Sequence, residues 1–234
     1  MAKRNTPLVP GEFYHVFNRG NSRQIIFRDD KDIDRFIKLL YLCNSENNFN
    51  FRDDIIKAKI DAWDFNRGQP LVSIGAWTLM PNHFHLYITV PNTALYQVKG
   101  EKGEQNISFF LEKLTRAYSR YFNTKYDRTG SLFEGKFKSV HVKTDTQGKY
   151  LFSYISLNAL KLKFPKWKEE GVKNAKESLQ FLNSYRWSSF IDYIGVERPE
   201  NVILDRKNFL DYFNNPKTFK EDIFEWLTFE EEVF

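Results

Sequence analysis

Cysteine and long apolar segments are scarce in this 234-residue chain, and each scarcity removes a class of protein. The single cysteine, Cys43, excludes a zinc site built from thiolates and is consistent with a reducing compartment. No apolar run reaches the length of a membrane span, and residues 1–7 lack the apolar region of a signal peptide. We therefore expect a cytoplasmic protein without a membrane-spanning segment.

The periodicity of the apolar residues predicts strands that alternate with helices. The predicted strands are 13–18, 71–79, 83–90 and 139–143, and the predicted helices are 29–44, 107–126 and 144–162. Their order, β-α-β-β-α-β followed by a helix, indicates an α+β protein with a ferredoxin-like antiparallel sheet and helices on one face. We expect residues 1–164 to form the core domain and residues 165–234 a helical extension packed on or near it.

Histidine is also rare, and two of the four histidines, His83 and His85, stand one residue apart. Side chains at positions i and i+2 of a strand share a face, so both imidazoles can reach one divalent metal ion. The alternative is a pair of polar residues on a half-exposed strand. The next same-face residue is Tyr87, which argues against a three-histidine hydrolase site, and no glutamate follows as in a cupin-like site. Further ligands must be oxygen donors from elsewhere in the chain, or water.

A second set of candidate residues lies on the helix predicted for 144–162. Tyr154 and Asn158 are four residues apart and share one helix face with Tyr150. A tyrosine phenolate can attack phosphorus, and an asparagine carbonyl suits a hard cation such as Mg²⁺ or Mn²⁺. The alternative is that Tyr154 packs on the sheet and Asn158 belongs to a local hydrogen-bond network.

Positive charge is concentrated in residues 113–143, which hold eight lysines or arginines and two acidic residues. Aromatic residues are interleaved with these cations: Tyr118, Tyr121, Phe122, Tyr126, Phe133 and Phe137. This combination fits single-stranded nucleic acid, because cations follow phosphates and rings stack on bases. A solvated helix face over an ordinary core explains it equally well. In residues 221–234, six acidic residues either shield the basic segment or stay in water beside a packed helix.

Several segments resemble, in the same order, the REP-associated tyrosine transposases, a branch of the single-tyrosine HUH (IS200-like) transposases that act on single-stranded DNA. The similar segments are 14–27, 80–85, 129–139, 154–158 and 187–190. The resemblance implies that His83 and His85 bind a divalent metal, Mg²⁺ or Mn²⁺. It also implies that Tyr154 is the nucleophile and that Asn158 completes the metal site. Together with the charge pattern, it leads us to expect DNA contacts from Arg19, Arg116, Arg120, Arg128, Lys136 and Lys138.

Two departures from the family pattern lie near these residues. Ala159 stands where the family usually has proline, so the helix is expected to continue into residues 160–162. Lys136 stands where arginine is common, and lysine keeps the charge but lacks the bidentate fork for phosphate. Neither change removes a catalytic group.

The function implied by the resemblance is cleavage and rejoining of single-stranded DNA at hairpin-associated, REP-like sites through a 5′-phosphotyrosine intermediate. The residues alone leave two alternatives: a non-catalytic or host-adapted DNA-binding protein derived from a transposase, and a zinc-dependent hydrolase that uses the histidine pair. Tyr150 is the rival nucleophile, and His15 and His141 are expected to be structural or DNA-contacting. We expect a monomer or a homodimer, with Tyr154 serving its own chain or a partner.

Overall fold

A computed structural model describes residues 7–90, 104–172, 174–209 and 215–228. Within these residues, four strands form one antiparallel sheet in the order β2-β3-β1-β4. The strands are β1 (Phe13–Arg19), β2 (Ser73–Met80), β3 (His83–Thr89) and β4 (Lys138–Val142). This strand order, with helices after β1 and β3, confirms the predicted α+β, ferredoxin-like fold.

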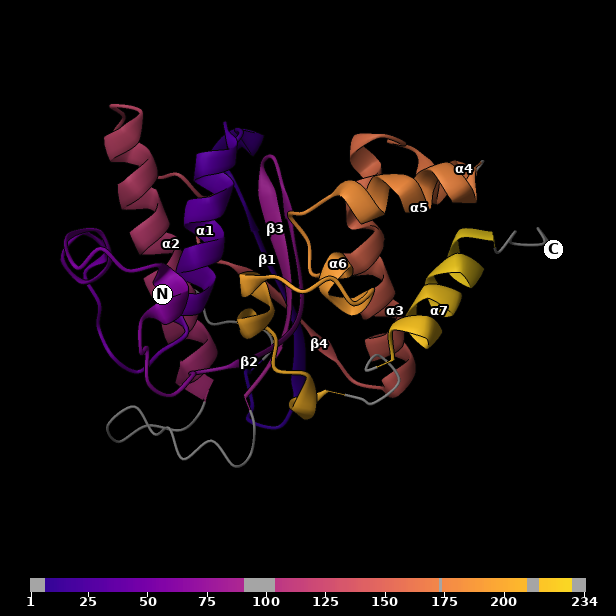
Figure 1. Cartoon of the computed structure of the whole chain (residues 1–234), viewed down its shortest axis with the longest axis horizontal. Helices are drawn as coiled ribbons and strands as arrows, with labels where there is room; N and C mark the ends of the chain where they lie inside the picture. Colours follow the sequence, from indigo (N-terminus) through magenta and orange to yellow (C-terminus); the bar gives the residue numbers. More distant parts are fainter. Residues whose placement is uncertain (1–6, 91–103, 173, 210–214, 229–234) are drawn as a thin grey trace.

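Helices α1 (Asp30–Cys43) and α2 (Glu104–Lys125) cover one face of the sheet (Figure 1). The Asp29 side chain caps α1 by accepting a hydrogen bond from a backbone N–H of the first turn. Phe36 and Leu40 of α1 pack against alternate residues of the strands, among them Val16 of β1 and Phe84 of β3. Because side chains alternate along a strand, the neighbours of these two strand residues point to the opposite face.

The aromatic rings of the basic segment belong largely to the core under α1 and α2. Tyr118, Phe122 and Phe133 are buried there, and the Tyr118 hydroxyl donates a hydrogen bond to the Ile26 carbonyl. These three rings are therefore not available to stack on bases. For them the ordinary-core interpretation of the segment is correct.

The second face of the sheet is covered by α3 (Asp145–Leu157) and by helices that follow it in the chain (Figure 1). These helices are α4 (Trp167–Glu170), α5 (Ala175–Ser184), α6 (Phe190–Tyr193) and α7 (Pro216–Thr228). The Phe209 ring packs so closely on a bulge in β2 that a Cβ on Gly75 would lie 2.6 Å from it. The chain after residue 164 thus shares a core with the sheet, and the boundary at 164 stays a prediction. No helix of the described residues has the length and apolar character of a membrane span.

The acidic segment packs on this second face through α7. Phe219, Ile223 and Leu227 are buried, whereas Glu221 and Glu225 are exposed. The packed-helix interpretation therefore holds as far as residue 228. Residues 229–234, which carry the rest of the acidic charge, lie outside the described residues.

The segment 187–190, which the sequence resemblance picks out, closes the β2 edge of the sheet. The backbone N–H of Leu79 donates to the Trp187 carbonyl, and that of Ser189 donates to the Trp77 carbonyl, each at 2.9 Å. Thr78 and Ser188 form an antiparallel bridge between them. This pairing covers the outer edge of β2 at residues 77–79, so that part of the edge is not open to another chain.

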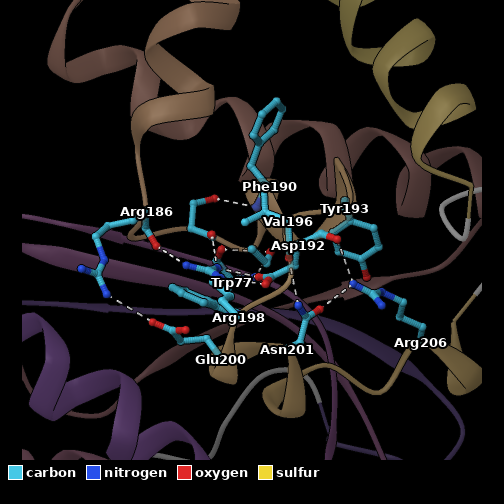
Figure 2. A network of polar contacts seen from close by, with 12 residues as sticks. Trp77, Arg186, Phe190, Asp192, Tyr193, Val196, Arg198, Glu200, Asn201 and Arg206 are labelled. Atoms are coloured by element: carbon cyan, nitrogen blue, oxygen red, sulfur yellow. Dashed lines mark hydrogen bonds and ion pairs between the residues drawn. The ribbon is translucent and has the colours of Figure 1, made fainter.

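A buried arginine holds the chain in place beside this edge (Figure 2). Arg198 donates two hydrogen bonds to the Asp192 carboxylate, at 2.7 and 2.6 Å. It also donates to the carbonyl oxygens of Arg186 at 2.5 Å and Ser188 at 2.7 Å. Its guanidinium carbon lies 5.3 Å from the centroid of the Trp77 ring in β2. The pair is desolvated, because the Asp192 side chain is 0% exposed and that of Arg198 is 9% exposed.

We expect Arg198→Met to lower the free energy of unfolding by about 3–5 kcal/mol, because the Asp192 carboxylate stays buried without its partner. The double variant Asp192→Leu/Arg198→Met removes both charges and should recover part of the loss. Urea denaturation followed by circular dichroism measures both values. A loss below about 1 kcal/mol in the single variant, typical of exposed pairs, would contradict the assignment of a buried pair.

Candidate active site

The β2–β3 hairpin presents the histidine pair on the face of the sheet that α3 covers. Pro81 and Asn82 form the tight turn between the strands, and β3 begins at His83. Phe84 points the other way and is buried under α1 and α2. The ring centroids of His83 and His85 lie 5.0 Å apart, with the ring planes at 90°. The two imidazoles thus share a face, as their spacing predicts.

Each imidazole of the pair is held through its Nδ1 atom. His83 Nδ1 lies 2.6 Å from Asn82 Oδ1, and His85 Nδ1 lies 2.8 Å from His15 Nε2. With a proton on each Nδ1, both rings donate these hydrogen bonds and keep the Nε2 lone pair for a metal ion. His15 is therefore an orienting partner of His85. Alternation along β1 places His15 on the same face as Phe17, but only the β1–β3 register of the folded sheet, which pairs Phe17 with His85, brings His15 to His85.

Burial keeps these imidazoles neutral. It lowers the pKa of His15 and of His83 to about 4, and it lowers the pKa of His85 well below the ordinary value. Nearby cations act in the same direction, Lys168 on the pKa of His15 and Lys161 on that of His83. Neutral imidazole is the form of the side chain that can coordinate a metal ion.

Helix α3 places Tyr154 beside the histidines. The Thr144 side chain caps the helix, and the Phe152 ring packs edge-on against Tyr193 of α6 and Phe219 of α7 on the side of α3 away from Tyr154. The Tyr154 ring is half-buried and meets the rings of His15 and His85 edge-on, with centroids 5.9 and 5.7 Å away. Burial raises the pKa of the Tyr154 hydroxyl. A nucleophilic role would thus require help in forming the phenolate.

Asn158 lies one turn beyond Tyr154, where α3 tightens into a 3₁₀ helix over Asn158–Leu162. The chain does stay helical past Ala159, but the single α-helix predicted for 144–162 is divided at this point. The Asn158 side chain is fully buried, and neither Oδ1 nor Nδ2 has a hydrogen-bond partner within the described residues. Its amide lies close to His83 and Tyr154 without reaching hydrogen-bond geometry, and it raises the pKa of His83 and lowers that of Tyr154, in each case against the effect of burial. An unpaired buried amide costs about 1–3 kcal/mol, so this side chain fits a ligand that the chain does not supply.

The donor atoms at this site suit a divalent metal. In the part of the chain that the structure describes, no three His, Cys, Asp or Glu side chains gather into a metal-binding group. His83, His85 and Asn158 do not fall under that pattern, because the third donor is an amide. Two imidazole nitrogens and one carbonyl oxygen fit Mn²⁺ or Mg²⁺ with water in the remaining positions.

A cation from the C-terminal part of the chain lies over the Tyr154 ring. The Lys168 ammonium, in α4, is 3.7 Å from the ring centroid. Burial lowers the pKa of Lys168 to about 8, and nearby Lys161 acts in the same direction. The sequence offers no signal for this contact, because residues 163–174 lack a clear period. Only folding brings Lys168 to the tyrosine.

Tyr150, the rival nucleophile, lies one turn before Tyr154 on α3. The two tyrosine rings are nearly parallel, at 11°, with centroids 6.4 Å apart. Tyr150 is 53% exposed and contacts Trp226 of α7 at 5.3 Å. The ring contacts to His15 and His85 are made by Tyr154, so Tyr154 is the tyrosine of this pair that lies beside the histidines.

The basic residues predicted to bind DNA divide between the two sides of the sheet. Arg19 lies opposite His83 in the β1–β3 register and forms an ion pair with Glu134. Lys138 lies opposite Phe17 in the β1–β4 register, on the same face. Arg116 and Arg120, by contrast, are exposed on α2, on the other side of the sheet (Figure 1).

Three further predicted residues lie around β4. Arg128 donates to the Asn123 side chain at 2.7 Å and so supports the turn before the strand. Lys136 is exposed in the segment that directly precedes β4. His141, on β4, is directed away from the histidine pair, lies 2.6 Å from the Glu12 carboxylate and stacks on Tyr14.

Comparison with known proteins gives similar solved structures at low sequence identity. A REP-associated tyrosine transposase bound to a REP hairpin is 13% identical, with a TM-score of 0.45 over 86% of this chain and 90% of that one. A proposed transposase of Deinococcus radiodurans R1 is 15% identical, with a TM-score of 0.32 over 64% and 93%. A bacterial tRNA(His) guanylyltransferase-like protein in complex with ATP is 13% identical, with a TM-score of 0.40 over 76% and 72%. No family model and no curated protein matches the chain.

Proposed function

We propose that the protein is a metal-dependent single-stranded DNA transposase or endonuclease that cleaves and rejoins DNA at hairpin-associated sites. The observation that carries the proposal is the meeting of Tyr154 with His85 and its partner His15 across the space between α3 and the sheet. The buried, unpaired Asn158 amide completes the same small site. A potential nucleophile beside metal-binding side chains suits phosphoryl transfer.

In the proposed reaction, the Tyr154 hydroxyl oxygen attacks the scissile phosphorus and the bond from phosphorus to the 3′ oxygen breaks. The phenolic proton leaves to solvent, and the departing 3′ oxygen takes up a proton from solvent and becomes a 3′-hydroxyl. The product is DNA joined to Tyr154 through a 5′-phosphate. Attack by another 3′-hydroxyl reverses the step and joins a new pair of ends, so no nucleotide cofactor is consumed.

His83, His85 and Asn158 would hold the divalent metal. When bound, the ion would polarise a non-bridging oxygen of the scissile phosphate and stabilise the charge that develops there. The hydrogen bonds that the two imidazoles donate to Asn82 and His15 would fix their orientation.

The surface beside the site has the features of a face that binds single-stranded DNA. Phe17 is half-buried, with its ring 5.7 Å from that of His85, and Val140 on the neighbouring strand is 54% exposed. Lys138 and Arg19 lie along the same face and can meet phosphates, Arg19 by exchanging its exposed partner Glu134. Apolar side chains beside cations suit unpaired bases and their backbone.

The test is incubation of the full chain with end-labelled single-stranded hairpin DNA and Mn²⁺ or Mg²⁺, followed by denaturing electrophoresis. A labelled adduct that survives denaturation, and that protease digestion removes, supports the proposal. Tight binding of hairpin DNA without any adduct, in both metals and over several REP-like sequences, would favour the non-catalytic DNA-binding alternative.

Lys168 supplies a further prediction for the same reaction. An ammonium over the ring stabilises a phenolate more than a neutral phenol, so Lys168→Met should slow adduct formation by roughly three- to thirtyfold, equivalent to about 0.6–2 kcal/mol. The pH at which the rate reaches half its maximum should rise, while the Kd for DNA changes little. Lys168→Arg keeps the charge and should retain most of the rate. An unshifted pH profile in Lys168→Met would show that Lys168 only packs against Tyr154.

A further inference from the structure

The chain between α1 and β2 forms an open groove against α1 and α2. This connection includes a π-helical turn at Phe51–Lys57 and lies on the side of the sheet away from α3 (Figure 1). The groove has a volume of about 890 Å³. It is therefore separate from the site around Tyr154, with the whole sheet between them.

Specific contacts fix the shape of this groove. The Lys113 ammonium of α2 donates to the Ser45 carbonyl at 2.7 Å and so ties the connection to the helix. The Arg35 guanidinium of α1 lies 3.5 Å from the centroid of the Phe51 ring and 4.6 Å from that of Tyr121. Lys113 and Arg35 thus connect the segment between α1 and β2, which forms one wall of the groove, to helices α2 and α1, which form the other.

The lining carries more positive charge than its acids balance. Among the described residues, seven basic and two acidic side chains line the groove. Asp53 and Glu112 each form an ion pair with a base four residues along the chain. Arg52 and Arg120 are exposed, and their guanidinium groups make no hydrogen bond or ion pair with other described residues. Arg35 and Lys113 are held by rings and by carbonyl oxygens, so Arg52 and Arg120 are the two cations that the groove leaves open to an anionic partner among the described residues.

Aromatic and apolar side chains lie among these cations. Phe49, Phe51, Phe109 and Tyr121 line the groove and are each partly exposed, and Ile56 is 57% exposed. Rings and cations in one groove match a single strand, whose bases are free to stack, better than a duplex, whose bases are already stacked.

We propose that this groove is a second binding site for single-stranded nucleic acid, distinct from the face that presents the scissile phosphate to Tyr154. It deepens the proposed function, since the strand it holds would be a segment of the same DNA away from the cleaved bond. A DNA strand that occupied both the groove and the site beside Tyr154 would pass around the edge of the β-sheet. Such binding would add affinity without placing any group at the reaction centre.

The test compares two double variants of the full chain. Arg52→Gln/Arg120→Gln removes the two groove cations whose guanidinium groups have no polar partner among the described residues. Lys176→Gln/Lys220→Gln removes the same charge from exposed positions on α5 and α7, on the other side of the sheet. Fluorescence anisotropy with a labelled mixed-sequence single strand gives Kd at salt concentrations from about 50 to 200 mM.

We expect the groove variant to bind roughly tenfold more weakly at low salt and the lysine variant to bind nearly as the parent does. The slope of log K against log salt should fall by about 1.4 in the groove variant, because each phosphate contact on a single strand contributes about 0.7. Equal losses in the two variants, no binding by the parent, or equal binding of a duplex of the same length would each overturn the proposal. Thermal melts check that both variants are folded.

Adduct formation on hairpin DNA, measured with the same proteins, separates this proposal from the proposed function. An adduct in the parent together with unchanged binding by the groove variant would reject the groove alone. Binding that depends on the groove, without any adduct in the parent, would reject the cleavage reaction alone.

Discussion

A Tyr154→Phe variant should form no covalent adduct with hairpin DNA. Only the phenolic oxygen is lost, and it is the proposed attacking atom, so the rate should fall by roughly 10⁴-fold or more, the scale expected for removal of a nucleophile. The Kd for single-stranded DNA should change little, because the ring and its contacts with His15 and His85 remain. Denaturing electrophoresis measures the adduct, and anisotropy measures binding.

Tyr150→Phe is the matched control for this prediction. It removes the same atom one turn earlier on the same helix face, from a residue that is 53% exposed. We expect it to retain adduct formation. An adduct that persists in Tyr154→Phe and disappears in Tyr150→Phe would identify Tyr150 as the nucleophile. The assignment of the other site residues would not change.

Loss of either histidine of the pair should eliminate cleavage and weaken Mn²⁺ binding by about 100-fold or more, since even outer partners of metal ligands contribute about 10–100-fold. The variants are His83→Ala and His85→Ala. Isothermal titration calorimetry gives the metal affinity without DNA. A second measurement is the rise in Tm with Mn²⁺, which binding to the native state produces in the parent and which these variants should lack.

The Asn158 amide should contribute less than the imidazoles. Water can replace a carbonyl ligand, so Asn158→Ala should weaken Mn²⁺ binding by only about tenfold. Asn158→Leu fills the same space without an unpaired buried amide, so the metal-free protein should unfold at an equal or higher urea concentration. If none of the substitutions at His83, His85 and Asn158 changes the Kd for Mn²⁺, these residues do not form the metal site and the proposal is wrong.

Local periodicity was sufficient to predict which candidate residues share a face. His83 and His85 lie two apart in a strand, and Tyr154 and Asn158 lie four apart in a helix, so their common directions follow from backbone geometry alone. The order of strands and helices likewise follows from apolar patterns, which is why the ferredoxin-like sheet could be predicted. These properties depend on neighbours within a few residues, and tertiary contacts did not alter them.

Charge and aromatic composition were less informative about the DNA-binding surface, because composition does not say which way a side chain faces once its helix has packed. The cations of residues 113–143 could be counted in the sequence, but α2 turns Arg116 and Arg120 away from the histidine face, whereas β4 brings Lys138 onto it. The rings of Tyr118 and Phe122 alternate with these cations, yet they are buried because the same helix must cover the sheet.

The sequence by itself determined the chemical groups of the candidate site and the face on which each pair lies. Only the tertiary structure decided that the two faces meet, with His15 bonded to His85 and Lys168 over the Tyr154 ring. It also decided that the Asn158 amide is buried without a partner. These contacts join residues from separate strands, from α3 and from α4, and their proximity depends on the burial of side chains throughout the core, which no local pattern encodes.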